Sequence, residues 1–157
     1  MQTIRLAIKP YLAEYLIKTY PSGEPGIVKV PPTLNLYEVI LSNMHGLKKE
    51  KADMDRWNVE IMLPNPSQSS SHRLTCKRYG VSGQGSIRIS RSIYILYWSD
   101  CHSYLEHRIN VHGDTIIDAI YGFLDSRGLT LSTEDAIRKN YQRWRMRRKS
   151  HAKDRNF

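Results

Sequence analysis

The residues of this chain with the clearest chemistry are the lysines and arginines near its C-terminus. Nine of the 24 Lys and Arg residues lie in the last twenty positions, and residues 136–157 contain a single acid, Asp154. This stretch therefore carries +9 − 1 = +8, which is nearly all of the net charge of +9 on the whole chain. Positive charge gathered on one segment indicates a polyanionic partner, and nucleic acid is the commonest one.

The basic stretch also has the spacing of an amphipathic helix. At about 100° per residue, Ile137, Tyr141 and Trp144 fall within about 60° of one another, so we expect them to face the core. Because Tyr141 and Trp144 share the spacing of Ile137, core packing is a better interpretation of these rings than base stacking. A second arc of the helix is polar and basic and contains Arg138, Gln142, Arg145 and Lys149.

The second arc has side chains that recognise base edges in the major groove of DNA. Arg forms paired hydrogen bonds with guanine, and Gln forms them with adenine. We expect base contacts from Arg138, Gln142 and Arg145. Phosphate contacts are expected from Lys139, Arg143, Arg147, Arg148 and Lys149. Five such contacts would make the affinity fall by about four to five powers of ten for each tenfold rise in salt.

Two further helices are expected to position the basic helix. The first begins at about Ser90 and continues to Gly113, because this segment is long and contains neither Gly nor Pro. The second is capped by Asp114 or Thr115 and ends at Gly128. Its apolar face comprises Ile116, Ile117, Ile120, Phe123 and Leu124.

The connection to the basic helix completes a recognisable arrangement. Ser132 is expected to cap that helix, with Asp135 near the place of a capping-box acid. Leu129 and Leu131 are expected to pack back between the helices. Two helices joined by a turn of about four residues that contains Gly match a helix-turn-helix motif.

The earlier part of the chain indicates short strands and helices. Alternation of apolar and polar residues predicts strands over 3–8, 27–30 and 57–63. Helical spacing predicts a helix over 10–20, and a second helix capped by Thr33 with its apolar face over Leu36, Tyr37, Ile40, Leu41 and Met44 and its end at Gly46.

Residues 73–89 predict weak strands around a hairpin turn at Gly83-Gln-Gly85. The fold class that follows is α+β. We expect a body of short strands and helices over 1–89, followed by a helical unit over 90–157 that ends in the helix-turn-helix.

No catalytic or metal site is expected. His102, His107 and His112 are spaced by five, which turns each ring about 140° from the last, whereas ligand pairs on a helix need spacings of three or four. Cys76 and Cys101 have no neighbours that would lower the pKa of a thiol, so buried or inert thiols are expected. We therefore infer no enzyme, no cofactor and no small-molecule ligand.

The cellular setting follows from what the sequence lacks. No apolar run approaches the roughly 18 residues that can span a bilayer. The first ten residues lack the long apolar centre of a secretion signal. A cytoplasmic protein without a membrane partner is expected.

Parts of the sequence resemble a known group. Residues 118–129 (Asp-Ala-Ile-Tyr-Gly-Phe-Leu-Asp-Ser-Arg-Gly-Leu) and 138–145 (Arg-Lys-Asn-Tyr-Gln-Arg-Trp-Arg) resemble the helix-turn-helix tail of small bacterial proteins of unassigned function, which are similar to Mor-type activators of phages and mobile elements. Residues 8–20 are similar to the start of the same group. The resemblance covers about a third of the chain and leaves out residues 48–89. It implies a regulatory, DNA-binding role, acting as a homodimer.

Three alternatives to DNA binding remain open from the sequence. An RNA-binding or ribosome-associated protein would use the same basic stretch on phosphates without reading bases. A protein-interaction module would keep its partner after deletion of residues 136–157, because the basic stretch would then serve solubility alone. An enzyme would require a buried cluster of carboxylates and histidines that the spacing does not predict.

Overall fold

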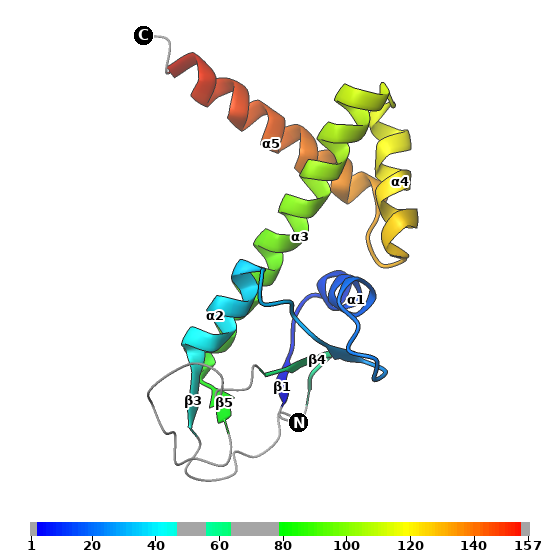
Figure 1. Ribbon diagram of the computed structural model, residues 1–157. Helices are drawn as coiled ribbons and strands as arrows, with labels where there is room; N and C mark the ends of the chain where they lie inside the picture. Colours follow the sequence, from blue (N-terminus) through cyan, green and yellow to red (C-terminus); the bar gives the residue numbers. More distant parts are fainter. Residues whose placement is uncertain (1–2, 47–55, 64–78, 155–157) are drawn as a thin grey trace. The chain divides into compact units, whose positions relative to one another are not determined.

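The structure is a computed structural model that describes residues 3–46, 56–63 and 79–154 (Figure 1). The strands are β1 (Thr3–Leu6), β2 (Ile27–Val28), β3 (Met44–Gly46), β4 (Val59–Met62) and β5 (Tyr79–Val81). The helices are α1 (Pro10–Thr19), α2 (Asn35–Asn43), α3 (Gly83–His112), α4 (Ile116–Arg127) and α5 (Glu134–Asp154). The α+β fold class expected from the sequence is confirmed.

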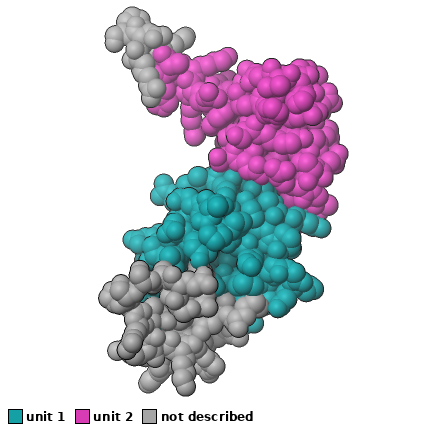
Figure 2. Space-filling view, viewed as in Figure 1, with its two compact units in different colours: residues 1–97 teal, residues 98–157 magenta. Residues whose placement is uncertain are grey.

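The chain divides into two compact units (Figure 2). Unit 1 comprises Met1–Tyr97 and unit 2 comprises Trp98–Phe157. The division falls inside α3, later along the chain than the boundary after position 89 that the sequence suggested. The reason is that α3 is one continuous helix, and its first half packs in unit 1.

β4 is the central strand of the sheet in unit 1. It pairs antiparallel with β1 and parallel with β2. Because alternate residues of a strand point to one face, Leu6, Val59 and Ile61 are all buried. α1 begins at Pro10, as predicted, and buries Leu16 in the same unit.

A row of buried side chains runs along α3. Every fourth residue from Ile89 is fully buried: Ile89, Ile93, Tyr97, Cys101 and Leu105. The row turns gradually around the helix, because four residues make slightly more than one turn. Its first three members pack in unit 1 and its last two in unit 2. In unit 1, the Tyr97 ring meets Tyr11 and Tyr15 edge-on, at centroid distances of 5.0 and 5.2 Å.

The hairpin turn expected at Gly83-Gln-Gly85 is wrong, because these residues form the first turn of α3. Ser82 caps the helix: its Oγ accepts from the Gly85 N–H at 3.1 Å, and its carbonyl accepts from the Ser86 N–H at 2.8 Å. Gly85 is required by packing, since a Cβ there would lie 2.6 Å from Val81 Cγ1. In the sequence alone, a glycine that is needed for close packing within a helix therefore looks the same as a glycine of a turn.

The end of the second predicted helix is also wrong. α2 stops at Asn43, and Met44 begins β3, which pairs antiparallel with β5 through Met44 and Val81. The helix has Leu34 at its N-cap without a side-chain hydrogen bond, so Thr33 is not the cap. Pairing with a distant strand outweighs the local helical spacing of Met44, a common override of propensity.

Unit 2 contains the end of α3, α4 and α5. Gly113 and Gly128 adopt positive φ values of 73° and 62°, which only glycine accepts easily, and they end α3 and α4 as predicted. Thr115 caps α4 by accepting from the Asp118 N–H at 3.1 Å. Arg127 of α4 donates to Asp100 of α3 through two nitrogens, at 3.0 and 3.1 Å, and fixes the two helices to each other.

Several local expectations for unit 2 are corrected. Ile117 and Leu131 are 47% and 56% exposed, whereas Leu129 is buried as expected. The cap of α5 is Thr133 and not Ser132, because its Oγ1 accepts from the Ala136 N–H at 3.3 Å. The connection spans residues 128–133, which is longer than the expected turn of about four.

Cys101 is fully buried, and burial together with the neighbouring Asp100 charge raises the pKa of its thiol to about 12. The burial expected for this thiol is confirmed, and Cys76 lies outside the described residues. In the described ranges, none of the helices combines the length and the apolar character needed to cross a membrane.

Candidate nucleic-acid interface

α5 begins with acids and continues with cations. Glu134 and Asp135 occupy its first turn, directly after the Thr133 cap. Negative charge at this position stabilises the positive end of the helix dipole, so the sequence favours a helix here. The same acids would be repelled by phosphates. In this respect α5 differs from the usual recognition helix, whose first turn contacts bases.

The acids bind the first two cations of the helix. Arg138 Nη2 lies 3.1 Å from Asp135 Oδ1, and Arg138 Nε lies 3.5 Å from Glu134 Oε1. Lys139 Nζ lies 2.8 Å from Asp135 Oδ2. Lys139 and Arg138 together hold the pKa of the Asp135 carboxyl below its usual range. Arg138 and Lys139, expected on a base and a phosphate, are therefore engaged by acids of their own helix.

Tyr141 joins α5 to α3 within unit 2. Its side chain is 1% exposed, and its hydroxyl donates to Glu106 Oε1 at 2.5 Å. Burial and the Glu106 carboxylate raise the pKa of Tyr141 to about 12, and the hydroxyl is protonated and donates at neutral pH. Ile137 is also 1% exposed. The core-facing seam predicted for these two residues is confirmed.

His102 of α3 belongs to the same contact between the two helices. We call this contact the joint: it comprises His102 and Glu106 of α3 with Asn140, Tyr141 and Trp144 of α5. Its Nε2 lies 2.8 Å from Asn140 Oδ1, and since that oxygen can only accept, the ring donates the proton. The ring also stacks on Trp144, with centroids 4.5 Å apart. Trp144 is half-buried, and its ring lies 5.8 Å from that of Tyr141. Tyr141 and Trp144 are therefore packing residues, as predicted.

Two arginines cover the outside of this aromatic joint. The Arg148 guanidinium lies 4.7 Å from the centroid of the Trp144 ring, and its Nη1 lies 3.5 Å from Glu106 Oε2. The Arg145 guanidinium lies 5.6 Å from the Tyr141 ring. Cations over aromatic faces are attracted by the ring electrons. Arg148 is thus turned toward α3, although the sequence suggested a phosphate contact.

Beyond Trp144, α5 buries no further side chain among residues 145–152, although Arg145 and Arg148 reach back over the rings of Tyr141 and Trp144. Residues 145–152 are all exposed, and Figure 1 shows the end of α5 running past the other helices of unit 2. Four exposed cations of α5 have no acidic partner in the described part of the chain. We call them the distal cations: Arg143, Arg145, Arg147 and Lys149. Gln142 is exposed beside them.

The distal cations repel one another. Arg143 lies four residues before Arg147, and Arg145 lies four residues before Lys149. Like charges at this spacing destabilise a helix by a few tenths of a kcal/mol for each pair. An anion placed along this part of α5 would relieve the repulsion. The end of α5 is therefore electrostatically complementary to a polyanion.

Comparison with protein-family models, with curated proteins and with solved structures found no match to this chain. The resemblance to Mor-type activators accordingly stays a prediction. What the site can do has to be argued from its geometry and charge.

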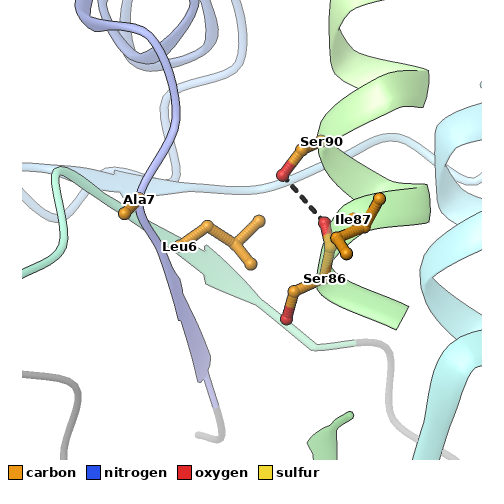
Figure 3. A pocket seen from close by; sticks show the side chains of 5 residues that line it. All are labelled: Leu6, Ala7, Ser86, Ile87 and Ser90. Atoms are coloured by element: carbon orange, nitrogen blue, oxygen red, sulfur yellow. Dashed lines mark hydrogen bonds between the residues drawn. The ribbon is translucent and has the colours of Figure 1, made fainter. Parts of the chain in front are cut away.

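A cleft in unit 1 has different chemistry (Figure 3). It encloses about 230 Å³ between the end of β1 and the first turns of α3, and is lined by Leu6, Ala7, Ser86, Ile87 and Ser90. The Ser90 hydroxyl donates to the Ser86 carbonyl at 2.8 Å. The volume lies below the roughly 300–1,000 Å³ of sites for small organic ligands, and no lining residue carries a charge. We assign no function to this cleft.

The histidines of α3 do not form a metal cluster. The rings of His107 and His112 approach to a centroid distance of 5.1 Å, closer than their spacing of five suggested, whereas His102 packs separately on Trp144. Across the described ranges, no three His, Cys, Asp or Glu side chains gather as they would around a metal ion.

Three residues of the joint were not anticipated from the sequence: His102 in its packing role, Glu106 and Asn140. His102 and Glu106 are four residues apart on α3, so they share a face of that helix. This spacing was the only available signal. It shows that two polar groups lie together, but it cannot show that α5 packs on them.

The joint predicts a pH-dependent stability of unit 2. Burial lowers the pKa of His102 below 6.5, against the opposing effects of Asn140 and Glu106. The unfolded chain therefore binds the proton more readily, so the stability from neutral His102 is full above about pH 6.5 and is lost as the pH falls through the lowered pKa. Urea unfolding between pH 7.5 and 4.5 measures the change in stability, and an NMR titration of the His102 ring measures its pKa.

In the His102→Gln variant, this component of the pH dependence is expected to disappear, because glutamine does not titrate. A ring titration midpoint at or above 6.5 in the folded wild-type protein would contradict the prediction.

Proposed function

We propose that this chain binds duplex DNA without catalysing a reaction, and that the exposed end of α5 is the element that contacts the DNA. The observation that carries the proposal is the set of four distal cations on a helix that is anchored to α3 at one end and exposed at the other. The anchor holds the direction of the helix. Its exposed part offers cations to a ligand without first having to break ion pairs.

The shape of α5 favours DNA over RNA. A helix with its side chains is about 10–12 Å wide, and the major groove of B-DNA is about 12 Å wide. The major groove of an RNA duplex is too narrow and deep for side chains to read. Because the first turn of α5 is acidic, we expect the middle and end of the helix to enter the groove, as in the continuous basic helices of zipper proteins.

The biological role proposed here extends the resemblance noted in the sequence. A small cytoplasmic regulator or accessory factor of a bacterial mobile element, acting as a homodimer, would use α5 on each half of its target. The resemblance supports this extension, whereas the charge and exposure of α5 support DNA binding itself.

The salt dependence of binding tests the proposal. Four phosphate contacts release counterions, so the logarithm of the association constant should fall with the logarithm of salt concentration with a slope of about −3.6. This is shallower than five contacts would give, because Lys139 is paired with Asp135 and Arg148 faces α3, while Arg145 joins the cations available to phosphates. Fluorescence anisotropy of a labelled duplex, titrated at several salt concentrations, measures the slope.

The same titration separates the alternatives. A structured RNA hairpin that competes as well as duplex DNA would favour an RNA-binding protein. A slope near zero, or unchanged binding after deletion of residues 136–157, would contradict the role given to α5.

A further inference from the structure

Three neighbouring rows of side chains run along the exposed part of α5, beside the row of Trp144 and Arg148 that contacts α3. At about 100° per residue, residues four apart form a row, and neighbouring rows are turned by about 100° from one another. One row contains Arg145 and Lys149, and another contains Arg143 and Arg147. Between them lies a row without charge: Gln142, Met146 and Ser150.

The uncharged row points away from the joint with α3. Tyr141 and Trp144 face α3, and Met146 is turned by roughly 140–160° from both of them. Met146 is 70% exposed, the highest value among the large apolar side chains in the described ranges. The surface of α5 that projects outward therefore has uncharged side chains along its centre and cations along both edges.

We infer that Gln142, Met146 and Ser150 read base edges in the major groove, while the two cationic rows contact the phosphates on either side. The inference rests on the proposed DNA-binding function and assigns its specificity. It replaces Arg138 and Arg145 as base readers, because Arg138 is paired with Glu134 and Asp135 and Arg145 belongs to a cationic edge.

The occupant of this surface follows from complementarity of charge and chemistry. A duplex presents two lines of phosphates with base edges between them, which matches two cationic rows with a neutral row between them. The Gln142 amide can donate to and accept from adenine through its N7 and N6 atoms. The Met146 side chain can pack on the C5-methyl group of thymine, an apolar feature of the major groove.

Ser150 completes the row. Its hydroxyl donates to the Arg147 carbonyl at 2.9 Å, which leaves its oxygen free to accept from a base amino group. The target that fits the row is therefore B-form DNA containing A·T pairs, recognised from the major groove.

Three short duplexes of equal length test the inference: alternating dA-dT, alternating dA-dU and alternating dI-dC. The dU duplex lacks only the thymine methyl groups. The dI-dC duplex resembles A·T in the minor groove but G·C in the major groove. We expect the wild-type protein to bind the dT duplex about fourfold more tightly than the dU duplex for each thymine methyl group that Met146 covers.

The dI-dC duplex lacks the thymine methyl groups, as the dU duplex does, so a comparison of these two isolates the contribution of Gln142. The dI-dC duplex should bind between about fivefold and roughly 150-fold more weakly than the dU duplex, because the paired hydrogen bonds of Gln142 cannot form. In Met146→Ala, the dT and dU duplexes should bind equally while the salt slope is unchanged. Alanine favours a helix, and Met146 is exposed, so the variant keeps α5 folded. Val111→Ala is the matched control, since Val111 is 67% exposed at the end of α3.

The outcomes separate this inference from the proposed function. A steep salt slope with equal binding of the dT and dU duplexes overturns the base-reading row and leaves DNA binding in place. The same holds if Met146→Ala keeps the difference or if Val111→Ala removes it. Absence of salt-dependent binding to all three duplexes overturns both proposals.

Discussion

Replacing the four distal cations of α5 with glutamine is expected to lower the affinity for duplex DNA by about a thousandfold at physiological salt. Each phosphate contact contributes about 0.9 to the salt slope, so four contacts give a slope of about −3.6. With this slope, the association constant at a physiological salt concentration of about 0.15 M is roughly a thousandfold higher than at 1 M salt. The salt slope of the variant should approach zero. Anisotropy titrations over a range of salt concentrations measure both quantities.

A variant with the same change of charge controls for net charge alone. Lys9, Lys18, Lys29 and Arg91 are exposed cations of unit 1. Their replacement by glutamine also removes four positive charges, but these residues lie outside α5. We expect the control to keep most of the affinity and the slope. Equal losses in the two variants would show that binding depends on total charge and not on α5.

Replacing Tyr141 with alanine is expected to lower the free energy of unfolding by about 3–5 kcal/mol. The side chain is 1% exposed, so its removal leaves a cavity between α3 and α5. It also leaves Glu106 without the hydroxyl that donates to it. Urea unfolding followed by circular dichroism measures the loss, and faster tryptic cleavage within α5 would report that the helix has left α3.

Two further variants divide this effect into packing and hydrogen bonding. Tyr141→Phe keeps the ring and removes the hydroxyl, so we expect a smaller loss of about 1–3 kcal/mol. Tyr121→Ala removes the same side chain from an exposed position on α4, where it is 51% exposed, and should cost under about 1 kcal/mol. A loss for Tyr141→Ala no larger than that for Tyr121→Ala would contradict the joint.

The two predictions address different properties of α5. Among the distal cations only Arg145 touches the joint with α3, through its guanidinium over the Tyr141 ring. Replacing all four should therefore change stability little, because the loss of this one exposed contact and the relief of repulsion between the cations are both small and opposite in sign. Tyr141 lies inside the joint, so its removal affects stability first. Measuring both properties for both variants distinguishes a ligand-binding role from a structural one.

Structural features that depend only on neighbouring residues were predicted correctly from the sequence. The helix ends at Gly113 and Gly128 follow from the freedom of glycine at positive φ. A cap at Asp114 or Thr115 was expected from their side-chain oxygens, and Thr115 is the cap. The seam of Ile137 and Tyr141 follows from a period of 3.6 residues. Each of these needs only a few consecutive residues to be read.

Structural features that depend on contacts between distant residues were not predicted from the sequence. Gly83-Gln-Gly85 has the composition of a turn, yet Gly85 serves close packing against Val81 inside a helix. Met44 has helical spacing, yet it pairs in a strand with Val81. In both cases a partner on another element decides the conformation, and local sequence does not identify that partner.

The sequence by itself determined that α5 is a helix with a buried seam and a large positive charge, because periodicity and charge are properties of consecutive residues. The pairs of Arg138 and Lys139 with Glu134 and Asp135 also lie within α5, at spacings of three and four residues. Only the tertiary structure decided that Arg148 is turned toward Glu106 of α3, and that Arg143, Arg145, Arg147 and Lys149 have no acidic partner among the described residues. The physical reason is that a pair within one helix follows from the helical period, whereas a contact between two helices depends on packing that brings distant residues together.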